Sequence, residues 1–190
     1  MMWTMDGAPE RKFHRADDRT GSGIVLTDGR VVEGYASVFG RRDQGGDTVM
    51  PGAYAGSLAG LARRGARVKM LWQHDPAQPI GIWDEVREDA TGLWVKGRIL
   101  TEVDKGREAV ALLAAGAIDG LSIGYRTLKA ERDAKGQRAL TELELWEVSL
   151  VTFPMLPEAR VAAKGGSPGA DVLRDLAAAF DEARHRLAAR

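Results

Sequence analysis

Hydrophobic residues alternate with polar or small residues along several short stretches of the chain, as they do in strands that bury one face. This pattern predicts strands at residues 24–26, 31–39, 68–73, 80–86, 93–100, 123–128 and 140–152. Thr27-Asp28-Gly29 separates the first two strands, and Asp89-Ala-Thr-Gly92 lies between the fourth and the fifth. Short connections that contain Asp and Gly are typical of tight turns, so two antiparallel hairpins are expected.

Two other stretches have helical spacing. Pro51 stands where a helix can begin without losing a hydrogen bond, and the alanine- and leucine-rich residues 53–64 continue it. Between residues 103 and 118, apolar side chains recur at every third or fourth position, which predicts a second helix. Thr101 or Asp104 is a candidate N-cap for that helix.

The composition of the chain divides it into four parts. Residues 1–22 are polar and of mixed charge, which predicts a flexible N-terminal arm before a domain that spans residues 23–163. Residues 164–170 are rich in Gly, Ser and Pro and are expected to form a linker. In residues 171–190, apolar side chains recur at helical spacing, so we expect a C-terminal amphipathic helix.

The apolar stripe of the helix at 171–190 must be buried against something, because an amphipathic helix on a tether is marginal in water. One interpretation is that the helix packs back on its own domain. The other is that it docks on a partner, which includes self-association with a second copy.

The overall charge and composition exclude several classes of function. The 27 Lys and Arg residues balance 27 Asp and Glu residues, so no global basic field is present to attract nucleic acid. Cysteine is absent, which excludes disulfides, thiolate metal sites and thiol catalysis. No apolar run is long enough to span a bilayer, and residues 1–22 lack the apolar core of a secretion signal. We therefore expect an intracellular, soluble protein with no membrane partner, no metal and no cofactor.

The stretch Ala117-Ile-Asp-Gly-Leu-Ser122-Ile-Gly-Tyr-Arg126 places one serine between Gly120 and Gly124. By strand alternation the serine and both glycines share a face, so no side chain stands beside the serine along its own strand. This environment would suit a nucleophile that a substrate backbone approaches closely. The alternative is that the glycines make room for another part of the same protein.

The same spacing, Gly-x-Ser-x-Gly, also occurs at the nucleophile elbow of α/β-hydrolases, but the context of Ser122 excludes that assignment. An elbow needs a strand before the serine, a helix after it and a histidine later in the chain. Here a helix precedes Ser122 and a strand follows it. The later histidine, His185, lies in the charged C-terminal helix.

Two further residues are candidates for a site. His74 ends the strand at 68–73 before Asp75-Pro76, and alternation places it on one face with Val68, Met70 and Trp72. Glu147 shares a face of the last strand with Leu143, Leu145, Ser149 and Val151, whereas Glu142 and Glu144 lie on the other face nearer the turn. A carboxylate among apolar neighbours needs a compensating partner. An arginine in a structural ion pair and a catalytic partner both remain possible for Glu147.

Five short motifs follow one another in an order that resembles a known family. They are Gly34-Tyr-Ala-Ser-Val-Phe39, Met50-Pro-Gly-Ala-Tyr54, Leu71-Trp-Gln-His-Asp75, Gly120-Leu-Ser-Ile-Gly-Tyr125 and Trp146-Glu-Val-Ser-Leu-Val-Thr-Phe-Pro154. Together they resemble the phage prohead (capsid maturation) serine proteases of the HK97 type, which are related to the herpesvirus assemblin proteases. The resemblance covers roughly residues 24–162.

The resemblance implies an α+β fold of the herpesvirus-protease kind, in which helices surround a β-barrel. It also implies a serine endopeptidase that removes the scaffolding portion of the major capsid protein, and usually cleaves itself, during phage prohead maturation. The major capsid protein and its scaffolding domain would be the partners. The protein would act in the host cytoplasm, inside the immature capsid. The C-terminal helix at 171–190 could then dock on a second protease subunit or on the scaffold.

Carried over to this chain, the family's histidine corresponds to His74 and its serine to Ser122. The third member corresponds to Glu147. The herpesvirus relatives use a second histidine there, and this chain has none near that position. Arg126 or Arg160 could assist the oxyanion. Two alternatives stay open, namely a non-catalytic capsid scaffolding protein of the same fold and a cytoplasmic serine esterase.

Overall fold

The computed structural model describes residues 24–132, 136–156, 159 and 161–163. The predicted arm at 1–22, the linker at 164–170 and the amphipathic helix at 171–190 lie outside the described residues. Arg160 lies outside them as well.

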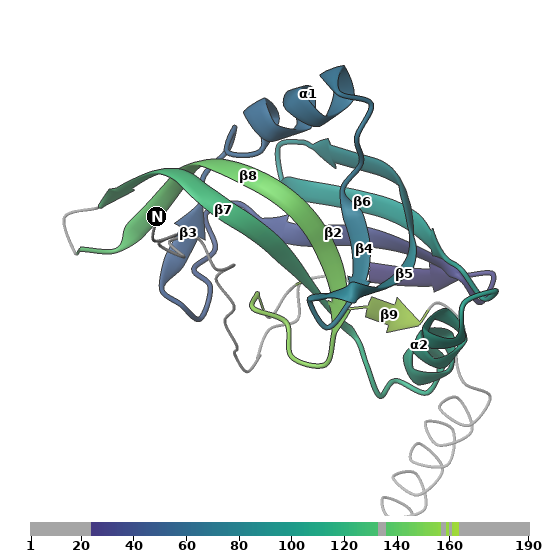
Figure 1. Ribbon diagram of the computed structural model, residues 1–190. Coiled ribbons are helices and arrows are strands. Elements are labelled where there is room, and N and C mark those ends of the chain that lie inside the picture. Colours follow the sequence, from purple (N-terminus) through teal and green to yellow (C-terminus); the bar gives the residue numbers. More distant parts are fainter. Residues whose placement is uncertain (1–23, 133–135, 157–158, 160, 164–190) are drawn as a thin grey trace, which may run out of the picture.

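Within the described residues, nine strands form one mixed sheet that curves into a half-barrel with two helices beside it (Figure 1). The strands are β1 (Ile24–Thr27), β2 (Val31–Val38), β3 (Asp47–Val49), β4 (Lys69–Trp72), β5 (Asp75–Glu88), β6 (Gly92–Ile99), β7 (Gly120–Arg132), β8 (Arg138–Val151) and β9 (Val161–Ala163). The seven strands expected from the sequence are all present. The described part of the chain therefore confirms an α+β fold. Its sheet forms a half-barrel with two helices, not the barrel surrounded by helices that the resemblance implies.

Strand β8 pairs with three other strands, β3, β4 and β7. The strand order is β3-β8-β4-β5-β6-β2-β1-β9, and β7 pairs with β8 outside this path. Because a strand has two edges and β7 runs antiparallel along nearly all of β8, β3 and β4 share the other edge of β8. Both of these pairings are parallel. Strand β8 thus lies between β7 on one side and β3 and β4 on the other.

Both predicted helices form, with shorter bounds than expected. Helix α1 spans Ala55–Arg63 and helix α2 spans Asp104–Ala114. The residue at the N-cap of α2 is Val103, and no side chain caps that end. The expected capping role of Thr101 or Asp104 is therefore wrong. No helix among the described residues has the length and apolar character needed to cross a membrane.

Both predicted hairpins are present. In the first, Asp28 and Gly29 have φ angles of 50° and 68°, which are the left-handed conformations that a tight type I′ turn requires. In the second, β5 begins at Asp75, earlier than the sequence predicts, and pairs with β6.

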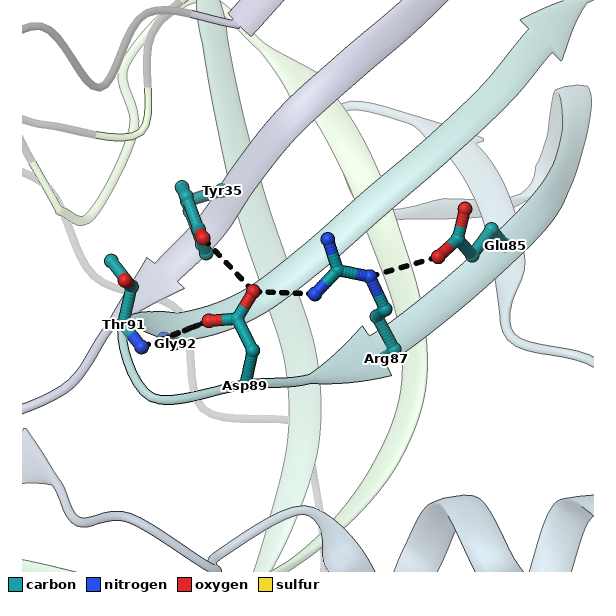
Figure 2. A network of polar contacts seen from close by, with 6 residues as sticks. All are labelled: Tyr35, Glu85, Arg87, Asp89, Thr91 and Gly92. Carbon is teal, nitrogen blue, oxygen red and sulfur yellow. Dashed lines mark hydrogen bonds and ion pairs between the residues drawn. The ribbon is translucent and has the colours of Figure 1, made fainter.

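The second hairpin turn is held by the carboxylate of Asp89 (Figure 2). Asp89 accepts hydrogen bonds from the Tyr35 hydroxyl at 2.9 Å and from Arg87 at 2.5 Å. It also accepts the backbone N–H groups of Thr91 and Gly92 at 2.8 and 3.2 Å. Desolvation raises the pKa of Asp89, but these hydrogen bonds together outweigh it and lower the pKa below its ordinary value.

The second half of β8 is covered on both faces. All five residues from Glu147 to Val151 are buried. Trp83 of β5 is 2% exposed and its indole N–H donates to the Val148 carbonyl at 3.2 Å, so it belongs to the core. In the first half of the strand, Glu142 is exposed and Leu143 is buried, so only one face is covered there.

Candidate active site

The register between β7 and β8 brings the predicted serine and glutamate to one face. Ser122 pairs with Ser149, and Gly124 pairs with Glu147. Directly paired residues in an antiparallel sheet project their side chains to the same side, with Cβ atoms about 4.5–5.5 Å apart. The side chains of Ser122, Ser149 and Glu147 therefore share one side of the sheet.

The glycines beside Ser122 make room for other side chains of the same protein. A Cβ atom on Gly124 would lie 2.0 Å from Glu147 Oε1, and one on Gly120 would lie 2.6 Å from Pro154 Cδ. This is the alternative that the sequence left open for these glycines. It also supports a site, because the space beside Ser122 holds a carboxylate that only glycine admits.

Glu147 is 8% exposed, so its carboxylate needs polar partners. His74 Nδ1 lies 2.5 Å from Oε1, and the Ser149 hydroxyl donates to Oε2 at 2.6 Å. Each carboxylate oxygen thus has its own partner. The partner of Glu147 is a histidine, so the alternative of a structural ion pair with arginine is not what the described residues show.

His74 reaches Glu147 because the backbone turns sharply before it. Gln73 and His74 have φ angles of 52° and 61°, and they form the two-residue turn between β4 and β5. Left-handed conformations are unfavourable for residues other than glycine and are found preferentially at functional sites. The turn also ends the alternation of β4. The expectation that His74 shares a face with Met70 and Trp72 is therefore wrong, since Met70 pairs with Val148 on the opposite side from Glu147.

Ser149 joins the site although no role is predicted for it from the sequence. Its hydroxyl is fully buried, donates to Glu147 and accepts the backbone N–H of His74 at 3.1 Å. A serine is a common residue in any strand, so its type carries no signal. Strand alternation places Ser149 on the same face as Glu147, two residues away, but this does not distinguish a role for it.

Ser122 lies at a small pocket of about 30 Å³. The residue is 2% exposed, and its hydroxyl makes no hydrogen bond to any described residue. Most buried polar atoms in proteins are paired, so this hydroxyl is an exception that a functional role would explain. The pocket is lined by Ala36, Ser37, Val38, Arg41, Asp43, Asp47, Val49, Leu121, Ser122, Ile123, Tyr125, Met155 and Leu156.

The other polar candidates lie elsewhere. Arg126 pairs with Glu144 at 2.8 Å and lines a different pocket beside α1. The structure does not bring Arg126 to Ser122, so it gives no support to an oxyanion role. The carboxylate of Asp75 accepts hydrogen bonds from Ala77 and Gln78 and is engaged within its own turn. Among the described residues, no group of three His, Asp or Glu side chains is placed to hold a metal ion.

The arrangement can activate a hydroxyl. A serine hydroxyl attacks a carbonyl only when a base takes its proton, and the base needs a third group that fixes its tautomer. With Glu147 accepting from Nδ1–H, the His74 nitrogen that can take a proton is Nε2. The short contact between His74 and Glu147 would stabilise the imidazolium formed in that step.

Comparisons with known proteins show the family of this chain. The chain is 32% identical over 149 residues to the prohead protease of Enterobacteria phage HK97, which covers 77% of this chain and 65% of that protein. The chain thus spans slightly less than two thirds of that relative. A solved structure, the capsid assembly protease of bacteriophage T4, aligns with 71% of this chain and 81% of its own at a TM-score of 0.49 and 15% identity. The sequence profile of caudovirus prohead serine proteases matches residues 19–169, and the chain belongs to this family.

Proposed function

We propose that this protein is a serine endopeptidase that removes the scaffolding portion of the major capsid protein during phage prohead maturation. It also cleaves itself, and it works in the host cytoplasm inside the immature capsid. Ser122, His74 and Glu147 form its catalytic triad, within a protease domain at residues 23–163. The observation that carries the proposal is the 2.5 Å contact between His74 Nδ1 and Glu147, made on the side of the sheet that also bears Ser122.

The mechanism follows from these roles. His74 Nε2 takes the proton of the Ser122 hydroxyl as the oxygen attacks the scissile carbonyl, and Glu147 stabilises the imidazolium that results. His74 then gives the proton to the leaving amine, and an acyl-enzyme on Ser122 remains. Water attacks this ester by the same base-assisted route, and the serine is restored.

Access to Ser122 requires movement of part of the pocket lining, because the residue is nearly fully covered. Most of the lining belongs to strands, whose backbone is held by sheet pairing. Met155 and Leu156 instead lie in the loop after β8, and that loop is tied to β7 by the hydrogen bond from Leu121 N–H to the Ala159 carbonyl at 2.8 Å. We expect a bound capsid segment to displace the side chains of this loop.

The experiment is co-expression of the full chain with the major capsid protein of the same phage, followed by gel electrophoresis and mass spectrometry. The capsid protein should lose its scaffolding portion with the wild-type chain. Ser122→Ala should abolish this processing while circular dichroism stays native. Ser57→Ala is the matched control, because it also removes a serine hydroxyl, but one on α1 that accepts a hydrogen bond from the Leu145 N–H at 2.9 Å. This variant should leave processing unchanged.

The outcomes separate the proposal from its alternatives. A non-catalytic scaffolding protein would support assembly equally well with Ser122→Ala and would leave the capsid protein intact. A serine esterase would hydrolyse a small acyl ester, but it would not cleave the capsid protein. Wild-type rates of capsid cleavage by folded Ser122→Ala would refute the proposal.

A further inference from the structure

We infer that Ser149 is a positioning residue of this site, which holds both the Glu147 carboxylate and the backbone of His74 in their working geometry. The inference rests on the proposed function. It assigns a fourth side chain to the site, one that acts through the other residues and does not react itself.

The first support is the burial and bonding of the hydroxyl. Ser149 is 0% exposed, and its hydroxyl has two hydrogen-bond partners. It donates to Glu147 Oε2 at 2.6 Å and accepts from the His74 N–H at 3.1 Å. A hydroxyl has one proton to donate, and here that proton goes to the carboxylate. The hydroxyl thus connects the glutamate and the histidine by a route separate from their direct contact.

The second support is what the hydroxyl does to the carboxylate. The carboxylate of a glutamate rotates easily about its last side-chain bond, so a carboxylate held at only one oxygen can turn. With Ser149 on Oε2 and His74 on Oε1, the plane of the carboxylate is fixed at both ends. Without Ser149, a buried oxygen would lose its donor, and the carboxylate would turn to find another one. That rotation would take Oε1 away from His74.

The third support is the turn that carries the imidazole. His74 has a φ of 61°, a conformation that an L-residue adopts only when its surroundings hold it there. The backbone N–H of His74 donates a hydrogen bond to the Ser149 hydroxyl on β8, which ties this turn to that strand. Ser149 is also the cross-strand partner of Ser122. Ser149 is therefore hydrogen-bonded to Glu147 and His74, and it is the cross-strand neighbour of Ser122.

The test compares Ser149→Ala, which removes the donor, with Ser149→Thr, which keeps the hydroxyl. Ser149→Cys keeps the size with weaker hydrogen bonding. Steady-state cleavage of a capsid-derived peptide by the full chain gives kcat and KM. Proton NMR gives the strongly downfield resonance expected of a short hydrogen bond between His74 Nδ1–H and Glu147, assigned by its absence from His74→Gln.

We expect Ser149→Ala to lower kcat about 100-fold, the loss typical of a catalytic group displaced by about 1 Å, with KM changed less than about twofold. The downfield resonance should disappear in Ser149→Ala and return, with most of kcat, in Ser149→Thr. A residue needed only for folding would lower the amount of active protein and leave the resonance of the folded fraction in place.

Folded Ser149→Ala with wild-type kcat and an unchanged resonance would overturn the inference. If Ser149→Ala does not fold, Ser149→Cys decides, because wild-type kcat in that variant would overturn it equally. The resonance does not depend on turnover. A wild-type chain that shows the Ser149-dependent resonance but cleaves nothing would refute the proposed function and leave the positioning role intact.

Discussion

Replacing Gly124 by alanine should inactivate the site through one added methyl group. A Cβ at this position would stand 2.0 Å from Glu147 Oε1, 2.7 Å from its Cδ and 2.8 Å from its Cγ. These atoms belong to the part of the side chain that contacts His74 and Ser149. The methyl group and the present position of the carboxylate are therefore incompatible.

The size of the effect follows from these distances. Ordinary contacts of a Cβ are 3.4–4 Å, so Oε1 would have to retreat by about 1.4 Å. A shift of that size breaks the 2.5 Å contact with His74, and a misplacement of about 1 Å in a catalytic group costs about 100-fold in rate. Overpacking a buried position also destabilises a protein by roughly 1–3 kcal/mol. For a chain of this length each kcal/mol lowers Tm by about 2–4 °C.

The assay measures kcat/KM on a capsid-derived peptide and Tm by calorimetry for the wild type, Gly124→Ala and Gly56→Ala. Gly56 is the matched control, because its added Cβ would meet Glu142 Oε1 at 3.6 Å, an ordinary contact. It lies in α1, where alanine is favoured over glycine by about 0.5–1 kcal/mol, so Gly56→Ala should be slightly more stable and fully active.

Two results would refute the reasoning. If Gly124→Ala keeps both the rate and the Tm of the wild type, Glu147 does not occupy the space beside Gly124. If its Tm falls while kcat/KM is unchanged, Glu147 is displaced but does not serve His74 in catalysis.

Three further predictions concern the carboxylates and the serine. Ser122→Ala should be at least as stable as the wild type in calorimetry, by up to about 1 kcal/mol, because it removes a buried hydroxyl that bonds to no described residue; a clear loss of stability would contradict this. Glu147→Gln should lower kcat strongly, whereas Glu144→Gln should be mild in the same assay, because Glu144 pairs at the surface, where an ion pair contributes about 0–1 kcal/mol. For Asp89, desolvation raises the pKa but its hydrogen bonds lower it further, so the folded-state pKa lies below that of the unfolded chain. Asp89 therefore stabilises the fold above its ordinary pKa of about 3.9, and this contribution is lost as pH falls through the lowered value. Thermal melts from neutral to acidic pH should show a smaller acid-induced fall in Tm for Asp89→Asn than for the wild type, and equal falls would contradict the role of Asp89.

Much of the fold could be predicted from the sequence because its strands alternate clearly and its turns carry specific residues. Asp28-Gly29 predicts the first hairpin through the left-handed conformations that such a turn needs. The pattern does not predict β3 (Asp47–Val49) or β9 (Val161–Ala163), because strands of three residues are too short to show a period. The half-barrel itself depends on pairings between distant strands, such as β4 with β8, which no local pattern contains.

The site could be predicted in part. Alternation in β7 and β8 correctly places Ser122 with its two glycines and Glu147 with Ser149. It fails at Trp146, where the register shifts, so that Leu145 lies on the opposite face from Glu147. The orientation of His74 could not be predicted in this way. Its direction is set by two consecutive left-handed residues, and neither Gln nor His marks such a turn as clearly as Asn-Gly would.

The most direct test of the central claim is covalent labelling of the serine by a fluorophosphonate, followed over time by intact mass and located by peptide mapping. This account predicts a single adduct on the peptide that contains Ser122. It predicts no adduct in Ser122→Ala and labelling slowed by at least about a thousandfold in His74→Ala, because the serine reacts only with its base in place. An adduct on a different serine, or a labelling rate of Ser122 that is unchanged in folded His74→Ala, would contradict the account.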